Sequence, residues 1–171
     1  MSGSTIADAL ARLSRTIESD PGKAHARHSP ATAIITGDLK CRVTGPHGEV
    51  IETNMPAAMG GNASQPNPGW YFRASLAACC STVIEQQAAR RGIELVELEV
   101  TVDSTGDIRG LLGLDDGISA GASAIRTSVR ISAPNASTEQ LHALVQWAND
   151  HSPVACTVRN APPNELNVSV G

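Results

Sequence analysis

The sequence lacks any block of Lys and Arg and any long apolar run. It has 13 basic and 17 acidic residues, for a net charge of -4. The sequence therefore predicts no basic surface that could bind a phosphate backbone. No segment approaches the ~20 apolar residues that cross a bilayer. Residues 1–25 mix charges of both signs and contain no apolar signal segment. We expect a cytoplasmic protein that binds neither nucleic acid nor membranes.

The chain also lacks the cysteine patterns of secreted and zinc-binding domains. Its cysteines, Cys41, Cys79, Cys80 and Cys156, are not densely spaced and form no CxxC pair. We therefore expect free thiols in a reducing compartment, with no cofactor. A metal site is not expected either, because the possible His and Cys ligands are scattered along the chain.

Aromatic residues are nearly missing, and three of the four lie in one stretch. This stretch, "NPGWYFRASLAACCSTVIEQQAARRG", spans residues 67–92, and its aromatic residues lie shortly before two adjacent cysteines. Asn67 as N-cap, Pro68 at the first helical position and Gly92 after the last predict one long helix. Because its N-terminal half is apolar nearly all round, we expect that half to be buried on most sides.

The two thiols of this helix point in different directions. Successive helical residues are ~100° apart, so Cys79 shares a face with Phe72 and Leu76 while Cys80 lies on another. A disulfide between adjacent residues of a regular helix is geometrically excluded. The two cysteines therefore do not form a redox pair with each other.

Hydrophobic periodicity predicts the remaining elements and an α+β fold in which sheet wraps a buried helix. We divide the chain into an N-terminal helical extension, residues 1–22, and one domain, residues 30–171. The predicted elements of the domain besides the long helix are a hairpin or meander over 32–56, strands at 94–103, 124–132 and 165–170, helices at 137–152 and 152–161, and a long loop or broad hairpin connection at 104–123, which is too rich in glycine for a helix. The first of the two helices is expected to begin with a capping box of Ser137 and Gln140, and the second with Ser152 as N-cap.

Several motifs occur together in the order typical of one family. They are "MPAAMGG", then "NP" opening a helix that contains "LAAC", then "RGI" before a strand, then "SPV" opening a late short helix. On these motifs the chain, from about Thr32 onward, resembles the osmotically inducible protein C and organic hydroperoxide resistance family. The resemblance implies β-sheets wrapped around a long buried central helix, in an intertwined homodimer whose active sites lie between the subunits. The N-terminal helix is an addition to that fold.

The resemblance also implies an enzyme, an organic hydroperoxide reductase. Cys79 matches the peroxidatic cysteine, whose thiolate attacks the peroxide and leaves as sulfenic acid. A dithiol reductant such as a lipoyl group then restores the thiol. Trp70, Phe72 and Leu76 are the candidate walls of a pocket for the alkyl hydroperoxide, although the aromatic residues fit a dimer contact equally well.

Three positions of the implied site carry other residues in this chain. The family's resolving cysteine corresponds to Ser152, the acid after Asn-Pro corresponds to Gly69, and the catalytic arginine falls near Asp38. A buried thiol without a cationic partner forms little thiolate at neutral pH. These departures leave the peroxidase chemistry dependent on replacements elsewhere in the chain.

Two residues are our candidates for those replacements. Arg42 could supply the positive charge, with Lys40 and Arg73 as alternatives. Cys156 could resolve a sulfenic acid, because it lies one helical turn after Ser152. Both Cys156 and Cys80 also have a simpler interpretation as core-filling residues.

Three functional classes remain open on the sequence. The first is a peroxidase that uses Cys79, by a one-cysteine route. The second is a non-catalytic dimer that keeps an apolar interface pocket for a small lipophilic ligand. The third is a purely structural or stress-associated dimer.

Overall fold

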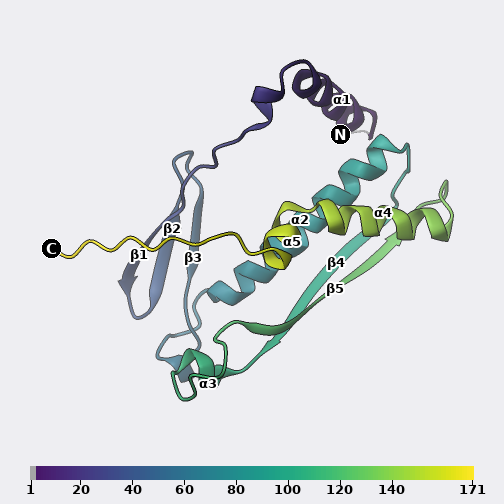
Figure 1. Ribbon diagram of the computed structural model, residues 1–171. Coiled ribbons are helices and arrows are strands. Elements are labelled where there is room, and N and C mark those ends of the chain that lie inside the picture. The colour runs from purple at the N-terminus through teal and green to yellow at the C-terminus, as the bar shows by residue number, and fades with distance from the viewer. Residues whose placement is uncertain (1–2) are drawn as a thin grey trace. The chain divides into compact units, whose positions relative to one another are not determined.

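The structure, a computed structural model, describes residues 3–171 (Figure 1). The chain divides into two compact units. One unit is Ala9–Ala74; the other is Ser75–Gly171 with the residues up to Asp8. The elements are α1 (Gly3–Ser19), β1 (Thr32–Gly37), β2 (Lys40–Thr44), β3 (Val50–Thr53), α2 (Pro68–Arg90), β4 (Glu97–Gly106), α3 (Ile108–Leu111), β5 (Ala122–Ser132), α4 (Thr138–His151) and α5 (Pro153–Arg159), with 3-10 turns at Pro21–Ala24 and Ala57–Met59.

The unit Ala9–Ala74 contains a three-stranded antiparallel meander in the order β1-β2-β3. The prediction of a hairpin or meander is confirmed, with one refinement. The first predicted strand segment is itself a hairpin, because Asp38 and Leu39 take φ values of 47° and 56° and reverse the chain between β1 and β2.

A buried asparagine organises the loop that leads from β3 toward α2. Asn54 is 1% exposed, and its side-chain oxygen accepts hydrogen bonds from the backbone nitrogens of Asn62 (2.8 Å) and Ala63 (3.1 Å). Its amide nitrogen donates to the carbonyl of Asp38 at 3.1 Å. The side chain therefore ties the Asn62 and Ala63 backbone to the turn between β1 and β2.

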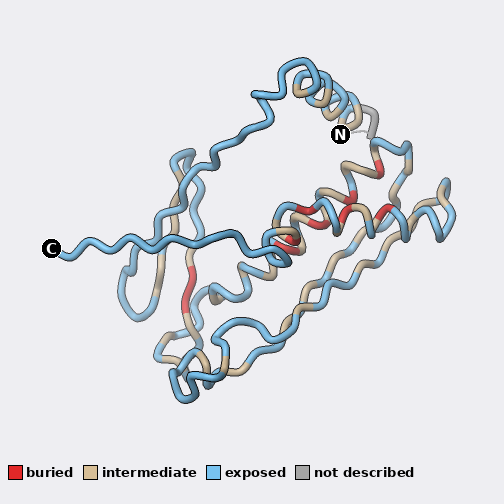
Figure 2. The backbone as a smooth tube through the Cα atoms, in the orientation of Figure 1, coloured by how far each residue is buried: buried red, intermediate tan, exposed pale blue. Residues whose placement is uncertain are grey.

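The unit Ser75–Gly171 is built on the long antiparallel hairpin of β4 and β5, in which Val100 pairs with Val129. The C-terminal part of α2 and the helices α4 and α5 pack on its apolar face, and Figure 2 shows the buried positions gathered along these three helices. The buried residues of this core are Leu76, Cys80, Ile84 and Ala88 of α2, Leu144 and Ala148 of α4, and Ala155 of α5.

The predicted helix boundaries are confirmed at their caps. The Asn67 side chain accepts from the Trp70 nitrogen at 2.9 Å, α2 begins at Pro68, and Gly92 follows its end with φ 65°. Helix α4 begins with the predicted capping box, in which Ser137 and Gln140 bond to each other's backbone.

Two expectations are wrong for the single chain. The N-terminal half of α2 is not buried on most sides, since Trp70 is 48% and Phe72 39% exposed and the chain itself leaves part of this apolar surface uncovered.

The glycine-rich connection is not free of helix, since α3 forms there. It forms because the Asp107 side chain caps the Arg109 nitrogen at 3.0 Å. The same Arg109 guanidinium holds the pKa of the Asp107 carboxyl below its ordinary value.

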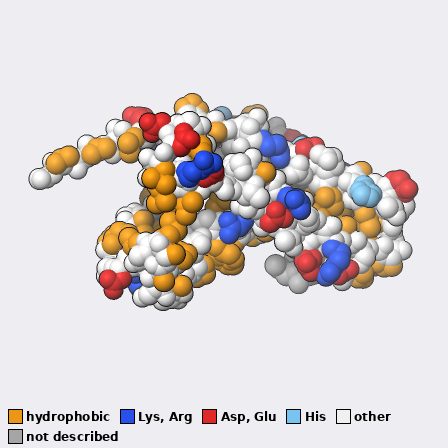
Figure 3. Space-filling view, turned by 90° about the horizontal axis from the view of Figure 1, so that it is seen from below, with side chains coloured by type: hydrophobic (Ala, Val, Ile, Leu, Met, Phe, Trp, Pro, Cys, Tyr) orange, Lys and Arg blue, Asp and Glu red, His pale blue; other side chains and the backbone are white. Residues whose placement is uncertain are grey.

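The predicted C-terminal strand is also wrong. Residues 165–170 form no strand, because no described strand pairs with them. Their apolar side chains alternate as a strand requires but are uncovered: Leu166 is 84%, Val168 73% and Val170 92% exposed (Figure 3). Within residues 3–171, no helix is long and apolar enough to cross a membrane.

Candidate active site

Helix α2 and the junction of α4 with α5 bring two thiols and one hydroxyl together. The Ser152 hydroxyl donates a hydrogen bond to the Cys79 sulfur at 3.2 Å. The Cys80 thiol approaches the same oxygen at 3.8 Å. Ser152 lies 73 positions after Cys79 and 72 after Cys80, so tertiary packing brings the hydroxyl to the two adjacent thiols.

The local sequence explains why Ser152 stands there. Helix α4 ends at His151, and Pro153 begins α5, so Ser152 is the cap between two helices. Its hydroxyl accepts from the Ala155 nitrogen at 3.4 Å, as the predicted N-cap requires. The residue is 0% exposed, which fixes the hydroxyl in a site without access to bulk water.

The two thiols have different surroundings. Cys80 is 3% exposed and packs in a cluster with Leu76 and Ala155, whereas Cys79 is half-buried. Their burial differs, as their different helix faces predict, although both thiols reach the same Ser152 hydroxyl. A reagent reaching the helix meets Cys79 more readily than Cys80.

Cys156, the candidate resolving residue, has partners of its own. Its thiol donates to the Asp150 carbonyl at 2.9 Å, and the Arg159 guanidinium donates to its sulfur at 3.2 Å. Ser152, rather than Cys156, is hydrogen-bonded to Cys79. A resolving role for Cys156 would require these contacts to break.

Arg42, the candidate cation, lies in the sheet of the unit Ala9–Ala74. It pairs with Glu52 across the β2–β3 ladder at 3.5 Å, and Lys40 reaches the same carboxylate at 3.3 Å. Near the start of α2 in the same unit, the Arg73 guanidinium lies 3.7 Å from the place a Cβ at Gly69 would take. A longer acidic side chain at position 69 would therefore lie beside Arg73.

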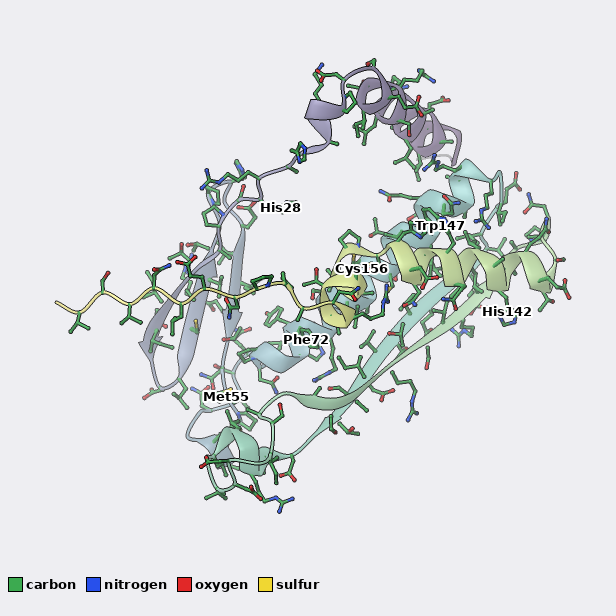
Figure 4. All side chains as sticks on the ribbon, in the orientation of Figure 1. His28, Met55, Phe72, His142, Trp147 and Cys156 are labelled. Carbon is green, nitrogen blue, oxygen red and sulfur yellow. The ribbon has the colours of Figure 1, made fainter. Side chains whose placement is uncertain are left out.

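The three candidate pocket residues line different surfaces. Leu76, together with Cys80, lines a pocket of about 450 Å³ in the unit Ser75–Gly171. Trp70 lines a pocket of about 290 Å³ in the other unit. Phe72 is 39% exposed (Figure 4).

A family model described as OsmC-like protein matches residues 60–167, which is more than half of the chain. The chain belongs to the OsmC family. No curated protein matches it at a significant level. The resemblance drawn from "LAAC" and "SPV" is confirmed, and the matched region includes α2, α4 and α5 with Cys79, Cys80 and Ser152.

Solved structures of this family have the same fold as this OsmC-like chain. An OsmC-like protein from Mycoplasma pneumoniae is 18% identical, with a TM-score of 0.68 over 80% of this chain and 91% of that one. An organic hydroperoxide resistance protein from Legionella pneumophila is 20% identical (TM-score 0.59, 80% and 92% covered). One from Bacillus subtilis is 24% identical (TM-score 0.54, 79% and 93% covered). At these identities the matches establish the α+β fold alone.

Sequence reasoning missed most of the surroundings of Cys80 in this OsmC-like chain. The pocket beside Cys80 is lined by residues of β5, α4 and α5 as well as α2, among them Ile125, Val145, Val158 and Arg159. No spacing signal connects these positions, because the elements that carry them meet only through tertiary packing. The contact between Ser152 and Cys79 could be predicted from the sequence, because the resemblance matched these two residues to the family's two cysteine positions.

Proposed function

We propose that this OsmC-like protein is a thiol peroxidase that reduces organic hydroperoxides through Cys79. The observation that carries the proposal is the 3.2 Å contact between the Cys79 sulfur and the Ser152 hydroxyl. Ser152 is the position at which the family motif places the second catalytic cysteine, so its contact with Cys79 supports a catalytic role for that thiol. Similarity to proteins named for organic hydroperoxide resistance supports the same reaction class.

The reaction proceeds by nucleophilic attack of sulfur on oxygen. The Cys79 thiolate attacks the terminal oxygen of the hydroperoxide, the O–O bond breaks, and the alkoxide takes a proton and leaves as the alcohol. Cys79 becomes a sulfenic acid. Two electrons have then passed from sulfur to the peroxide, and the enzyme must be reduced before the next turnover.

Reduction follows a one-cysteine route in this proposal. Ser152 has no sulfur with which to form a disulfide, so an external dithiol such as a lipoyl group attacks the Cys79 sulfenic acid and releases water. The second thiol of the reductant then displaces Cys79 as a thiol and closes its own disulfide. The route fits a protein of the reducing cytoplasm, where dithiol reductants are available.

Trapping the intermediate tests this proposal. We expect that cumene hydroperoxide, added with dimedone, labels Cys79, and that peptide mass spectrometry finds little label on Cys80 or Cys156. The half-buried Cys79 is accessible to the reagents, whereas Cys80 is 3% exposed. Label on Cys156 alone, or on no cysteine, contradicts the proposal.

A homodimer forms part of the same proposal. Trp70 at 48% and Phe72 at 39% exposure leave an apolar surface on α2 that a single chain does not cover. We expect light scattering to give a mass twice the 17.7 kDa of one chain, and Phe72→Asp to lower it. A wild-type protein that remains monomeric at micromolar concentration contradicts this part.

A second candidate function rests on the pocket beside Cys80. Its volume of about 450 Å³ lies in the range of small-molecule sites, and Leu76, Ile84 and Val129 are among its apolar lining residues. It would hold a small lipophilic ligand without any chemistry at sulfur.

A further inference from the structure

We propose that Ser152 is a positioning residue for the Cys79 nucleophile, as the middle member of a hydrogen-bond chain from Cys80 through Ser152 to Cys79. This inference rests on the proposed peroxidase function and adds a role for a residue that stands where the family motif has a cysteine. It also gives the buried Cys80 thiol a place in the site.

The direction of the chain follows from the bonding capacity of a hydroxyl. A serine oxygen has one proton to donate and two lone pairs with which to accept. The Ala155 nitrogen donates to it at 3.4 Å and the Cys80 thiol at 3.8 Å. Its single proton is then directed to the Cys79 sulfur, 3.2 Å away.

The Ser152 hydroxyl is held rigidly in this orientation. The residue is fully buried, and its carbonyl accepts from the Cys156 nitrogen at 2.8 Å in the first turn of α5. Water therefore does not compete for the proton. A hydrogen bond to a charged acceptor in such a site is stronger than one between neutral groups, and a donor behind it polarises it further. The hydroxyl thus stabilises negative charge on Cys79 and fixes the direction of the sulfur.

Serine at this position has a second consequence for the reaction. A cysteine there would condense with the sulfenic acid on Cys79, forming an S–S bond and releasing water. The hydroxyl of Ser152 keeps the hydrogen bond but does not form that bond. The oxidised Cys79 consequently remains a sulfenic acid until an external thiol attacks it, and the reductant acts directly on Cys79.

Alkylation of Cys79 by iodoacetamide at neutral pH tests the positioning role without any hydroperoxide. We expect Ser152→Ala to slow the reaction of Cys79 roughly tenfold through loss of a hydrogen bond to a charged group. Cys41, a half-buried thiol of β2 outside α5, serves as the reference and is expected to keep its rate. Peptide mass spectrometry follows both sites in one sample.

A matched control separates this role from helix capping, since Ser152→Ala also weakens the start of α5. Thr157→Gly also lowers the stability of α5 and keeps the Ser152 hydroxyl, because Thr157 is exposed on the same helix. We expect Cys79 in this variant to react at the wild-type rate or faster. Opening of the helix exposes thiols and speeds alkylation, whereas loss of the hydrogen bond slows it. An unchanged or faster Cys79 in Ser152→Ala overturns the proposal.

The variant Ser152→Cys tests the geometry in the oxidised state. With the sulfur of Cys79 within reach, one equivalent of hydroperoxide is expected to give a disulfide between Cys79 and the introduced thiol, seen by non-reducing peptide mapping, and to abolish the dimedone adduct. A persistent adduct without a disulfide overturns the proposed proximity. If Ser152→Ala slows alkylation of Cys79 but wild type gives no dimedone adduct, the peroxidase function is contradicted and the positioning role of Ser152 is supported.

Discussion

Replacing Cys79 with serine is expected to lower the consumption of cumene hydroperoxide by roughly a thousandfold or more. The oxygen of serine keeps the size and the hydrogen bond of the site, since Ser152 donates to this position at 3.2 Å, but it is a far weaker nucleophile at neutral pH. The loss therefore reports chemistry rather than folding. The assay follows peroxide with dihydrolipoamide as reductant.

Two matched variants complete this experiment. Cys80→Ser keeps a donor toward Ser152 in a buried position, and we expect it to retain at least a tenth of the wild-type rate. Cys156→Ser is expected to retain full activity under the one-cysteine route, because its thiol is bonded to Asp150 and Arg159. A large loss in Cys156→Ser would make that residue the displaced resolver. Full activity in Cys79→Ser would remove the peroxidase proposal.

The same variant separates the two candidate functions. The pocket of about 450 Å³ is lined by Cys80 and not by Cys79, so Cys79→Ser leaves its walls intact. Saturable binding of an apolar fluorescent probe that survives Cys79→Ser, together with no turnover in wild type, favours the ligand-binding function. Turnover that disappears in Cys79→Ser favours the enzyme.

Local signals in the sequence predicted the helices that carry the site. Asn67 and Pro68 fixed the start of α2, and Ser152 with Pro153 fixed the start of α5, because caps act within one turn and depend little on the rest of the fold. The α+β class and the family followed from motifs within these helices. The separation of Cys79 from Cys80 followed from helical geometry alone.

Burial and pairing were harder to predict, because they depend on distant elements. The alternation in residues 165–170 is that of a strand, yet a strand requires a partner edge, and sequence alternation does not supply one. The apolar start of α2 posed the same difficulty. Its composition predicts that the side chains are buried, but it does not identify the residues that bury them. The pocket beside Cys80 depends on the packing of β5, α4 and α5, which no local pattern encodes.

Leu144→Ala is expected to destabilise the protein by about 3 kcal/mol, the usual cost of emptying a fully buried leucine site. Leu144 is 0% exposed and packs with Ile84, Ala88 and Ala148 where α4 meets α2. The helix it anchors leads directly into Ser152, so the loss of packing also loosens the hydrogen bond to Cys79. Urea unfolding measures the stability, and iodoacetamide measures the reactivity of Cys79.

Leu166→Ala is the matched control for this variant. Leu166 is 84% exposed, and its truncation in the single chain is expected to change stability by less than about 0.5 kcal/mol. Equal effects of the two substitutions would contradict the assignment of the core to α2, α4 and the β4–β5 hairpin. A destabilised Leu144→Ala in which Cys79 keeps its wild-type reactivity would show that the Ser152 contact is held by α5 and its cap, independently of the packing of α4.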